Sequence, residues 1–224
     1  PSVSTPYKTY HVIATSEWKE RRPMGEKQLE KCLIEYYTCL LKTEDKFRDF
    51  FKSSETPLSS LKNEIEQLRL VSDEKLNKAE ICGIDGLRGK LIFKINVAIE
   101  DEISLIYGIC LQINNANQGL KNKFDVLVAA RNKADPKRPE MKEIIIGTPL
   151  KPRLDLLMEW AIDSSQYYNE LSSRINRCVK SLDCKNDESV VNLIESFNEE
   201  KIKRAKIDRI LGFTQFLSRE TMRE

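Results

Sequence analysis

The chain has 224 residues, of which 40% are hydrophobic and 32% charged, so its length allows one large domain or two small ones. Thirty-seven Lys and Arg against 35 Asp and Glu give a formal net charge of +2. This balance suits a cytoplasmic and nuclear protein and gives no general reason to expect nucleic-acid binding. The sequence contains no run of about 18 apolar residues, so no membrane span is predicted, and residues 1–6 lack the pattern of a signal peptide.

The first part of the chain predicts an arm followed by a helical hairpin. Residues 1–26 show no clear hydrophobic period and are expected to dock on the body or on a partner. From Lys27 to about Lys52, apolar residues recur at alternating steps of three and four, which is typical of a buried helical stripe. Thr56 is the predicted N-cap of a second helix and Pro57 its first residue, so a break is expected there. The predicted stripe residues are Leu29, Leu33, Tyr36, Leu40, Phe47, Phe50, Leu58, Leu61, Ile65 and Leu68.

A long helix is predicted from about Leu87 to residue 131, the end of a unit that begins at residue 27. Many of its stripe residues are β-branched, but their three-and-four spacing over several turns favours a helix over a strand. Gly108 and Gly119 indicate positions where this helix could kink or break. Gly86 to Gly89 match the bare G-x-x-G of a KH domain, although a turn that starts a helix is favoured because no strands accompany it. The stripe comprises Ile92, Ile95, Ile99, Ile103, Ile106, Cys110, Ile113, Leu120, Phe124 and Leu127.

Residues 132–152 contain four prolines among charged residues and are predicted to be a linker or insertion. Its apolar run, residues 143–147, is expected to pack on the bundle as an extended plug, or alternatively to pair as a strand with residues 10–15. Residues 153–224 are predicted to add three helices that complete the same bundle. Their stripe residues are Leu154, Leu157, Ala161, Ser164, Tyr168, Leu171, Ile175, Cys178, Leu182, Val190, Leu193, Ile194, Phe197, Ile207, Ile210, Leu211, Thr214 and Leu217. The predicted fold is therefore all-α, an up-and-down antiparallel bundle of about five or six helices with coiled-coil-like stripes.

The residue types needed for common active sites are scarce. A single histidine, His11, would have to serve any Ser-His-Asp or Cys-His mechanism. The favoured interpretation is a partly exposed residue in a terminal segment, with no catalytic role. The six cysteines include no C-x-x-C pair, so they predict neither a zinc site nor any other metal, and core packing is expected instead. Glu159 beside Trp160, with Asp163 one turn on, could form a two-carboxylate site, but nothing in the sequence predicts a cleft around it. We expect no enzyme activity and no cofactor.

Two basic runs could contact RNA phosphate. The first lies at residues 131–138, and the second contains Lys201, Lys203, Arg204 and Lys206. Acidic residues flank the second run on both sides, so a solvated helix face with ion pairs one turn apart is favoured for it. RNA binding would require the two runs to converge on one face of the bundle.

Apolar and aromatic residues at the ends of the predicted bundle exceed what a closed monomer needs. Large aromatic side chains dominate protein-binding hot spots, so these residues predict an interaction protein. The candidate anchors are Tyr7, Tyr10, Trp18, Trp160, Tyr167 and residues 144–146.

Two segments resemble a known family. Residues 57–68 read Pro-Leu-Ser-Ser-Leu-Lys-Asn-Glu-Ile-Glu-Gln-Leu, and residues 152–160 read Pro-Arg-Leu-Asp-Leu-Leu-Met-Glu-Trp, followed by Asp163 and Tyr168. Both are similar to the small helical ribosome-maturation adaptors that bind AFG-type AAA+ ATPases, and the resemblance extends over about residues 27–220. The chain departs from that pattern in its arm and in a longer, proline-marked stretch at residues 115–150.

The resemblance implies a non-enzymatic subunit of an AAA+ ATPase assembly. Its partners would be the ATPase subunits and a second small helical adaptor similar to the cyclin-dependent-kinase-interacting protein, and it would meet pre-ribosomal particles indirectly. The implied role is late maturation of the large ribosomal subunit, with a further link to chromatin and replication. Trp18, Trp160, Tyr168 and Glu159 are the residues expected to bind partners. The alternatives are a coiled-coil tether or kinase-adaptor subunit, and a helical RNA-binding module.

Overall fold

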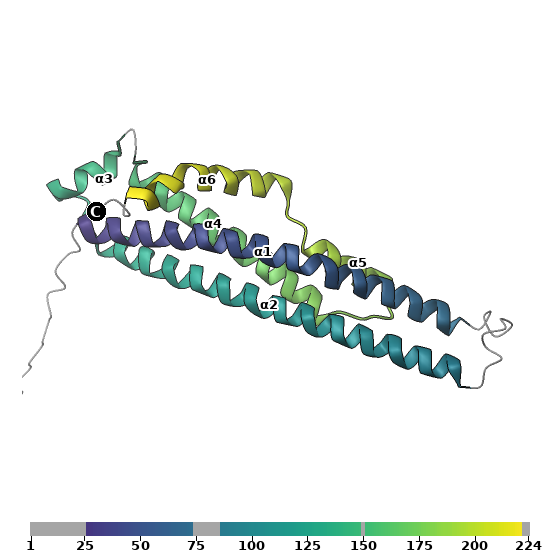
Figure 1. Cartoon of the computed structure of the whole chain (residues 1–224). Helices are drawn as coiled ribbons and strands as arrows, with labels where there is room; N and C mark the ends of the chain where they lie inside the picture. Colours follow the sequence, from purple (N-terminus) through teal and green to yellow (C-terminus); the bar gives the residue numbers. More distant parts are fainter. Residues whose placement is uncertain (1–25, 74–85, 149–150, 221–224) are drawn as a thin grey trace, which may run out of the picture.

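The computed structural model describes residues 26–73, 86–148 and 151–220, and these form an elongated bundle of helices (Figure 1). Two long helices, α1 and α2, run antiparallel along its whole length, and α4, α5 and α6 pack on part of that pair. No described segment is a β-strand, so the all-α prediction is confirmed. None of the described helices is sufficiently long and apolar to cross a membrane. The elements are α1 (Glu26–Ser72), α2 (Leu87–Lys133), the 3-10 helix η3 (Pro139–Met141), α3 (Lys142–Ile146), α4 (Leu154–Lys180), α5 (Asp187–Ser196) and α6 (Lys201–Glu220).

Helix α1 is one continuous helix of 47 residues, and the predicted break at Thr56 and Pro57 was wrong. A proline inside a helix removes one backbone hydrogen bond and costs about 3 kcal/mol. Downstream of it, Leu58, Leu61 and Ile65 are buried. Burial of each such side chain contributes roughly 1.5–3 kcal/mol. Packing along α2 therefore outweighs the local preference of the proline, and the predicted hairpin between residues 27 and 68 does not form.

Helix α2 also runs for 47 residues without a break, so neither Gly108 nor Gly119 interrupts it. Its predicted stripe is buried or partly buried against α1 and α4. The helix begins at Leu87, and its N-cap Gly86 has a φ of 72°. This left-handed conformation strains residues with a side chain, which explains a glycine at that turn. The G-x-x-G sequence is thus the start of a helix.

Replacing Gly119 with Ala is expected to stabilise the chain by about 1 kcal/mol, because Ala restricts the unfolded chain and favours the helix. An added Cβ there meets nothing within 4 Å. Thermal unfolding should show a melting temperature about 2–4 °C higher. The contrasting control is Gly147→Ala, where φ is +80° and a Cβ would lie 2.7 Å from the backbone nitrogen of Arg153. That variant should have a lower melting temperature than the unmodified chain. Equal changes in melting temperature at the two sites would contradict the view that the backbone at Gly147 requires glycine and that at Gly119 does not.

The apolar run at residues 143–147 packs on the bundle, as predicted, but not as an extended plug. Residues 142–146 form the short helix α3, in which Ile144 and Ile145 pack against the core while Ile146 is exposed. One helical turn satisfies backbone groups that an unpaired extended segment would leave bare next to the core. The alternative strand partner, residues 10–15, lies outside the described residues. The three C-terminal helices were predicted correctly.

Buried polar groups connect the helices at defined points. The Tyr36 hydroxyl donates to the backbone oxygen of Ala161 at 2.8 Å, and the Tyr37 hydroxyl donates to that of Leu157 at 2.5 Å. Both bonds link α1 to α4. Between α2 and α4, the side-chain amides of Asn114 and Asn176 bond to each other. Because a buried polar group costs free energy when it has no partner, these bonds select one register between the helices.

Candidate functional site

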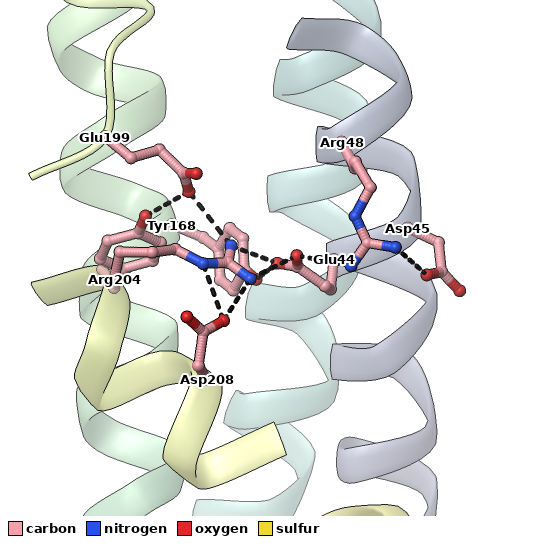
Figure 2. Close-up of polar contacts among 8 residues, drawn as sticks. Glu44, Asp45, Arg48, Tyr168, Glu199, Arg204 and Asp208 are labelled. Atoms are coloured by element: carbon pink, nitrogen blue, oxygen red, sulfur yellow. Dashed lines mark hydrogen bonds and ion pairs between the residues drawn. The ribbon is translucent and has the colours of Figure 1, made fainter. Parts of the chain in front are cut away.

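The most strongly interacting charged groups lie inside the bundle, where α1, α4 and α6 meet (Figure 2). Glu44 of α1 is at the centre, and its side chain is only 6% exposed. Arg204 of α6 reaches it from the opposite side and is 22% exposed. We name this group the Glu44 cluster. Its members are Glu44, Arg48, Tyr168, Glu199, Arg204 and Asp208.

Both carboxylate oxygens of Glu44 accept hydrogen bonds from the Arg204 guanidinium. The Nη2 atom lies 2.6 Å from Oε1 and the Nη1 atom 2.8 Å from Oε2. The Tyr168 hydroxyl donates to Oε2 at 2.6 Å. Arg48, one turn along α1, donates to Oε1 at 3.2 Å. A two-pronged pair of this kind has both charge and geometric complementarity, so it holds α6 on α1 in one orientation.

The pKa values in the Glu44 cluster reflect this mutual satisfaction. Burial alone would raise the pKa of Glu44, but the hydrogen bonds from Arg204 and Tyr168 outweigh it, and the pKa lies below its ordinary value. Burial and the neighbouring Glu44 carboxylate raise the pKa of Tyr168 well above its usual range. Glu44 therefore stays ionised and Tyr168 stays protonated near neutral pH. Because every central group already has a partner, we assign the cluster a structural role.

Tyr168 of α4, one of the aromatic residues expected to anchor a partner, is instead part of the core. Its side chain is fully buried and its ring lies 4.9 Å from the ring of Phe47. Trp160 is half-buried and stacks on Phe213 of α6 with ring centroids 5.5 Å apart, while Glu159 is exposed. Trp18 lies outside the described residues. Tyr168 is thus inaccessible to a partner in this structure, while Trp160 and Glu159 stay candidates.

Three of the four basic residues of the second run are engaged within the bundle. Lys203 contacts Glu170 at 3.1 Å, and Lys206 contacts Asp163 at 2.7 Å. Arg204 belongs to the Glu44 cluster, and Lys201 is exposed. The ion pairs match the helix face favoured from the sequence, except that their partners come mainly from other helices. This run therefore offers little free positive charge to RNA.

The described residues contain no group of three or more His, Cys, Asp or Glu that could hold a metal ion. Cys32 and Cys110 are buried in the core, as expected for small apolar side chains. Burial raises the pKa of the Cys110 thiol to about 11. The carboxylate pair considered above does not form, because Glu159 is exposed and Asp163 pairs with Lys206. His11 lies outside the described residues.

A surface that sequence reasoning missed lies on α2, on the side away from α1 and α4. Phe93 is 69% exposed and Leu111 is 62% exposed. With Val97 and Tyr107, which are also exposed, they follow one another at steps of four, ten and four residues. At 100° per residue these steps keep all four side chains on one face of the helix. We name these residues the outer stripe. The sequence signal that could have predicted the outer stripe is the set of apolar residues that lie between the buried positions of α2.

A second exposed apolar feature is a groove at the end of the bundle where α2 ends and α4 begins. Its volume is about 680 Å³. The side chains of Met141, Ile145, Leu154 and Met158 line its floor, and Ile146 and Ile162 contribute exposed apolar surface. Charged side chains also line the groove, namely Arg131, Arg153, Asp155, Glu159 and Asp163.

Comparison with known proteins gives one family. The sequence profile of the CA109-like family, described as Ribosome biogenesis protein C1orf109-like, matches residues 27–211. This range begins at the start of α1 and ends within α6. No curated protein and no solved structure matches the chain. The match includes the whole described bundle up to the middle of its last helix.

Proposed function

We propose that the chain, which belongs to the Ribosome biogenesis protein C1orf109-like family, is a non-enzymatic adaptor of an AAA+ ATPase. In this role it acts in late maturation of the large ribosomal subunit, where it connects the ATPase to pre-ribosomal particles. The family description supports the part in ribosome biogenesis. The ATPase and the stage of maturation come from the resemblance of residues 57–68 and 152–160 to the adaptors described above. A connection to chromatin and replication, and a location in nucleus and cytoplasm, belong to the same proposal.

The observation that carries this proposal is the outer stripe of α2. Large apolar side chains that face solvent along a helix are typical of a surface that receives a partner helix. The stripe extends over residues 93–111, about five turns, which matches a helix better than a loop or a small molecule. We assign it to the second small helical adaptor, the subunit similar to the cyclin-dependent-kinase-interacting protein. The ATPase then meets the composite surface that the two adaptors form, with Trp160 and Glu159 as candidate contacts.

The first test uses Phe93→Glu together with Leu111→Glu in the full chain. Each change places a charge where a partner would bury an apolar side chain, so together they should weaken partner binding at least about 10-fold. The measurement is affinity purification of the tagged chain, with quantitative mass spectrometry of the AAA+ ATPase subunits and the helical adaptor. The matched control is Ile202→Glu with Leu70→Glu, which introduces the same charges at exposed apolar residues of α6 and α1.

The proposal requires that the unmodified chain and the control recover the same ATPase, while the outer-stripe variant does not. Equal recovery by both variants would contradict the assignment of the stripe. Recovery of kinase subunits or cytoskeletal proteins in place of an ATPase would contradict the adaptor role itself and favour the tether or kinase-adaptor alternative. Circular dichroism of both variants separates loss of binding from loss of the fold.

A further inference from the structure

Basic side chains accumulate at the end of the bundle where α2 gives way to η3 and α3. Residues 131–142 contain five basic and two acidic residues, although the whole chain has a net charge of only +2. Within the described part of the chain, none of the five takes part in an ion pair. Arg138 is partly exposed and the others are exposed. We name them the α2-end cations: Arg131, Lys133, Lys137, Arg138 and Lys142.

The stability of the fold explains only part of this pattern. Arg131 and Lys133 lie in the last turn of α2, where cations favour the helix dipole. Lys137 and Arg138 follow the helix, and Lys142 is the first residue of α3, a position where a cation gains nothing from the dipole. The carboxylate of Asp135 accepts a hydrogen bond from the backbone nitrogen of Lys137 at 3.0 Å, so this acid stabilises the turn. A fold that needed only stability would not require three further cations here.

Several basic residues elsewhere in the described part of the chain pair with acids. Lys123 contacts Glu35 and Arg153 contacts Asp155, both at 2.9 Å. The cations of α6, Lys203 and Lys206, are paired as described above. What distinguishes the α2 end is density, because five basic residues that are unpaired in the described part of the chain lie there within twelve positions that hold only two acidic residues.

We infer that the α2-end cations bind phosphate groups of single-stranded RNA. The inference rests on the role in ribosome biogenesis that the proposed function includes, but not on the ATPase partner. Exposed Arg and Lys bind the RNA backbone because each phosphate they neutralise releases counterions into solution. Asp155 and Glu159 line the groove that Arg131 also lines. These carboxylates repel phosphate, which confines the RNA to the side formed by the end of α2, η3 and α3.

The number of cations gives a quantitative expectation. Each phosphate contact in a single strand contributes about −0.7 to the slope of log K against log salt concentration, so five contacts predict a slope of about −3.5. Affinity should consequently fall by about 100-fold between 50 and 200 mM salt. Because the contacts are to the backbone, affinity should depend weakly on RNA sequence.

The test measures binding of the purified full chain to a fluorescently labelled single-stranded RNA of 20 nucleotides by anisotropy, at several salt concentrations. The variant combines Arg131→Glu, Lys137→Glu and Lys142→Glu. Its matched control combines Lys52→Glu, Lys90→Glu and Lys94→Glu, three exposed lysines elsewhere on α1 and α2, and changes the net charge equally. We expect at least a 10-fold loss of affinity and a slope about 2 less negative for the first variant, and a change below 3-fold for the control. A second variant with Gln at positions 131, 137 and 142 should also bind weakly, and it guards against misfolding caused by charge reversal.

Equal losses in the variant and its control would overturn the inference, because general charge and not this cluster would then determine binding. Absence of RNA binding by the unmodified chain at 50 mM salt would overturn it as well. So would competition by an acidic polyglutamate peptide as effective as that of unlabelled RNA, since the cluster would then be a site for an acidic protein. The outer-stripe variant Phe93→Glu with Leu111→Glu should bind RNA normally. RNA binding and ATPase recruitment can therefore fail independently, and each failure is assigned to its own proposal.

Discussion

Replacement of Glu44 with Leu should destabilise the chain by about 3 kcal/mol, measured as the free energy of unfolding in urea. Removal of one member of a buried ion pair leaves the other charge without its main partner, which typically costs about 3–5 kcal/mol. Arg204 keeps contacts with Glu199 and Asp208 and is partly exposed, so the lower end of that range applies. The loss should be accompanied by weaker attachment of α6, seen as faster hydrogen exchange of its backbone amides.

The control for this prediction removes both charges. The double variant Glu44→Leu with Arg204→Met should recover most of the lost stability, because apolar side chains of similar size can replace a buried ion pair at little cost. A double variant less stable than the single one would contradict the role assigned to the pair.

The pH dependence of the free energy of unfolding gives a second check on the contribution of Glu44. The folded-state pKa of Glu44 lies below its ordinary value of 4.5, so its contribution is complete above the unfolded value and is lost as the pH falls through the folded one. The difference in the free energy of unfolding between the unmodified chain and Glu44→Leu should therefore become smaller at acid pH.

Truncation of Tyr168 to Ala should destabilise the chain by about 3–5 kcal/mol, the cost typical of removing a large aromatic side chain from a core. The ring is fully buried, and it contacts the rings of Phe47 and Tyr167. Its hydroxyl also donates to Glu44. Tyr168→Phe keeps the ring and should cost about 1–3 kcal/mol, because it leaves the buried carboxylate with one donor fewer. Chemical denaturation of both variants measures the two contributions.

The matched control for Tyr168 is Trp160, another aromatic residue of α4 that was expected to bind a partner. Trp160 is partly exposed and stacks on Phe213, which is itself more than half exposed. Trp160→Ala should consequently cost less stability than Tyr168→Ala. If Tyr168→Ala unfolded at the same urea concentration as the unmodified chain, the residue would not be a core residue, and its role as a partner anchor would return.

Short-range patterns were sufficient to predict most of the helices. The stripe from Leu154 to Leu182 keeps its spacing without interruption, and α4 extends from Leu154 to Lys180. The β-branched residues of α2 did not mislead, because the spacing of buried positions repeats over many turns. Pro57 led to the wrong prediction of a helix break because the free-energy cost of a proline inside a helix is visible in the sequence. The apolar contacts that outweigh this cost depend on α2, which lies farther along the chain.

The candidate sites were harder to predict, because their partners are distant in sequence. Glu44 lies between Leu40 and Phe47 at the spacing of a buried stripe, and this was the signal that could have identified it. Its partner Arg204 is 160 residues away within a run that looked uniformly basic. The sequence could not indicate which cations of that run are neutralised by other helices, nor that those at the end of α2 are not.

Repetition of apolar residues every three or four positions determined by itself that this protein is a bundle of antiparallel helices, since that period depends only on the geometry of one helix. Two short segments were also sufficient to suggest the ribosome-biogenesis family. Only the tertiary structure decided which polar and aromatic residues are internal and which face solvent. Burial and charge pairing depend on several helices together. For this reason Tyr168 lies in the core and Arg204 links two helices, while the outer stripe and the α2-end cations face solvent.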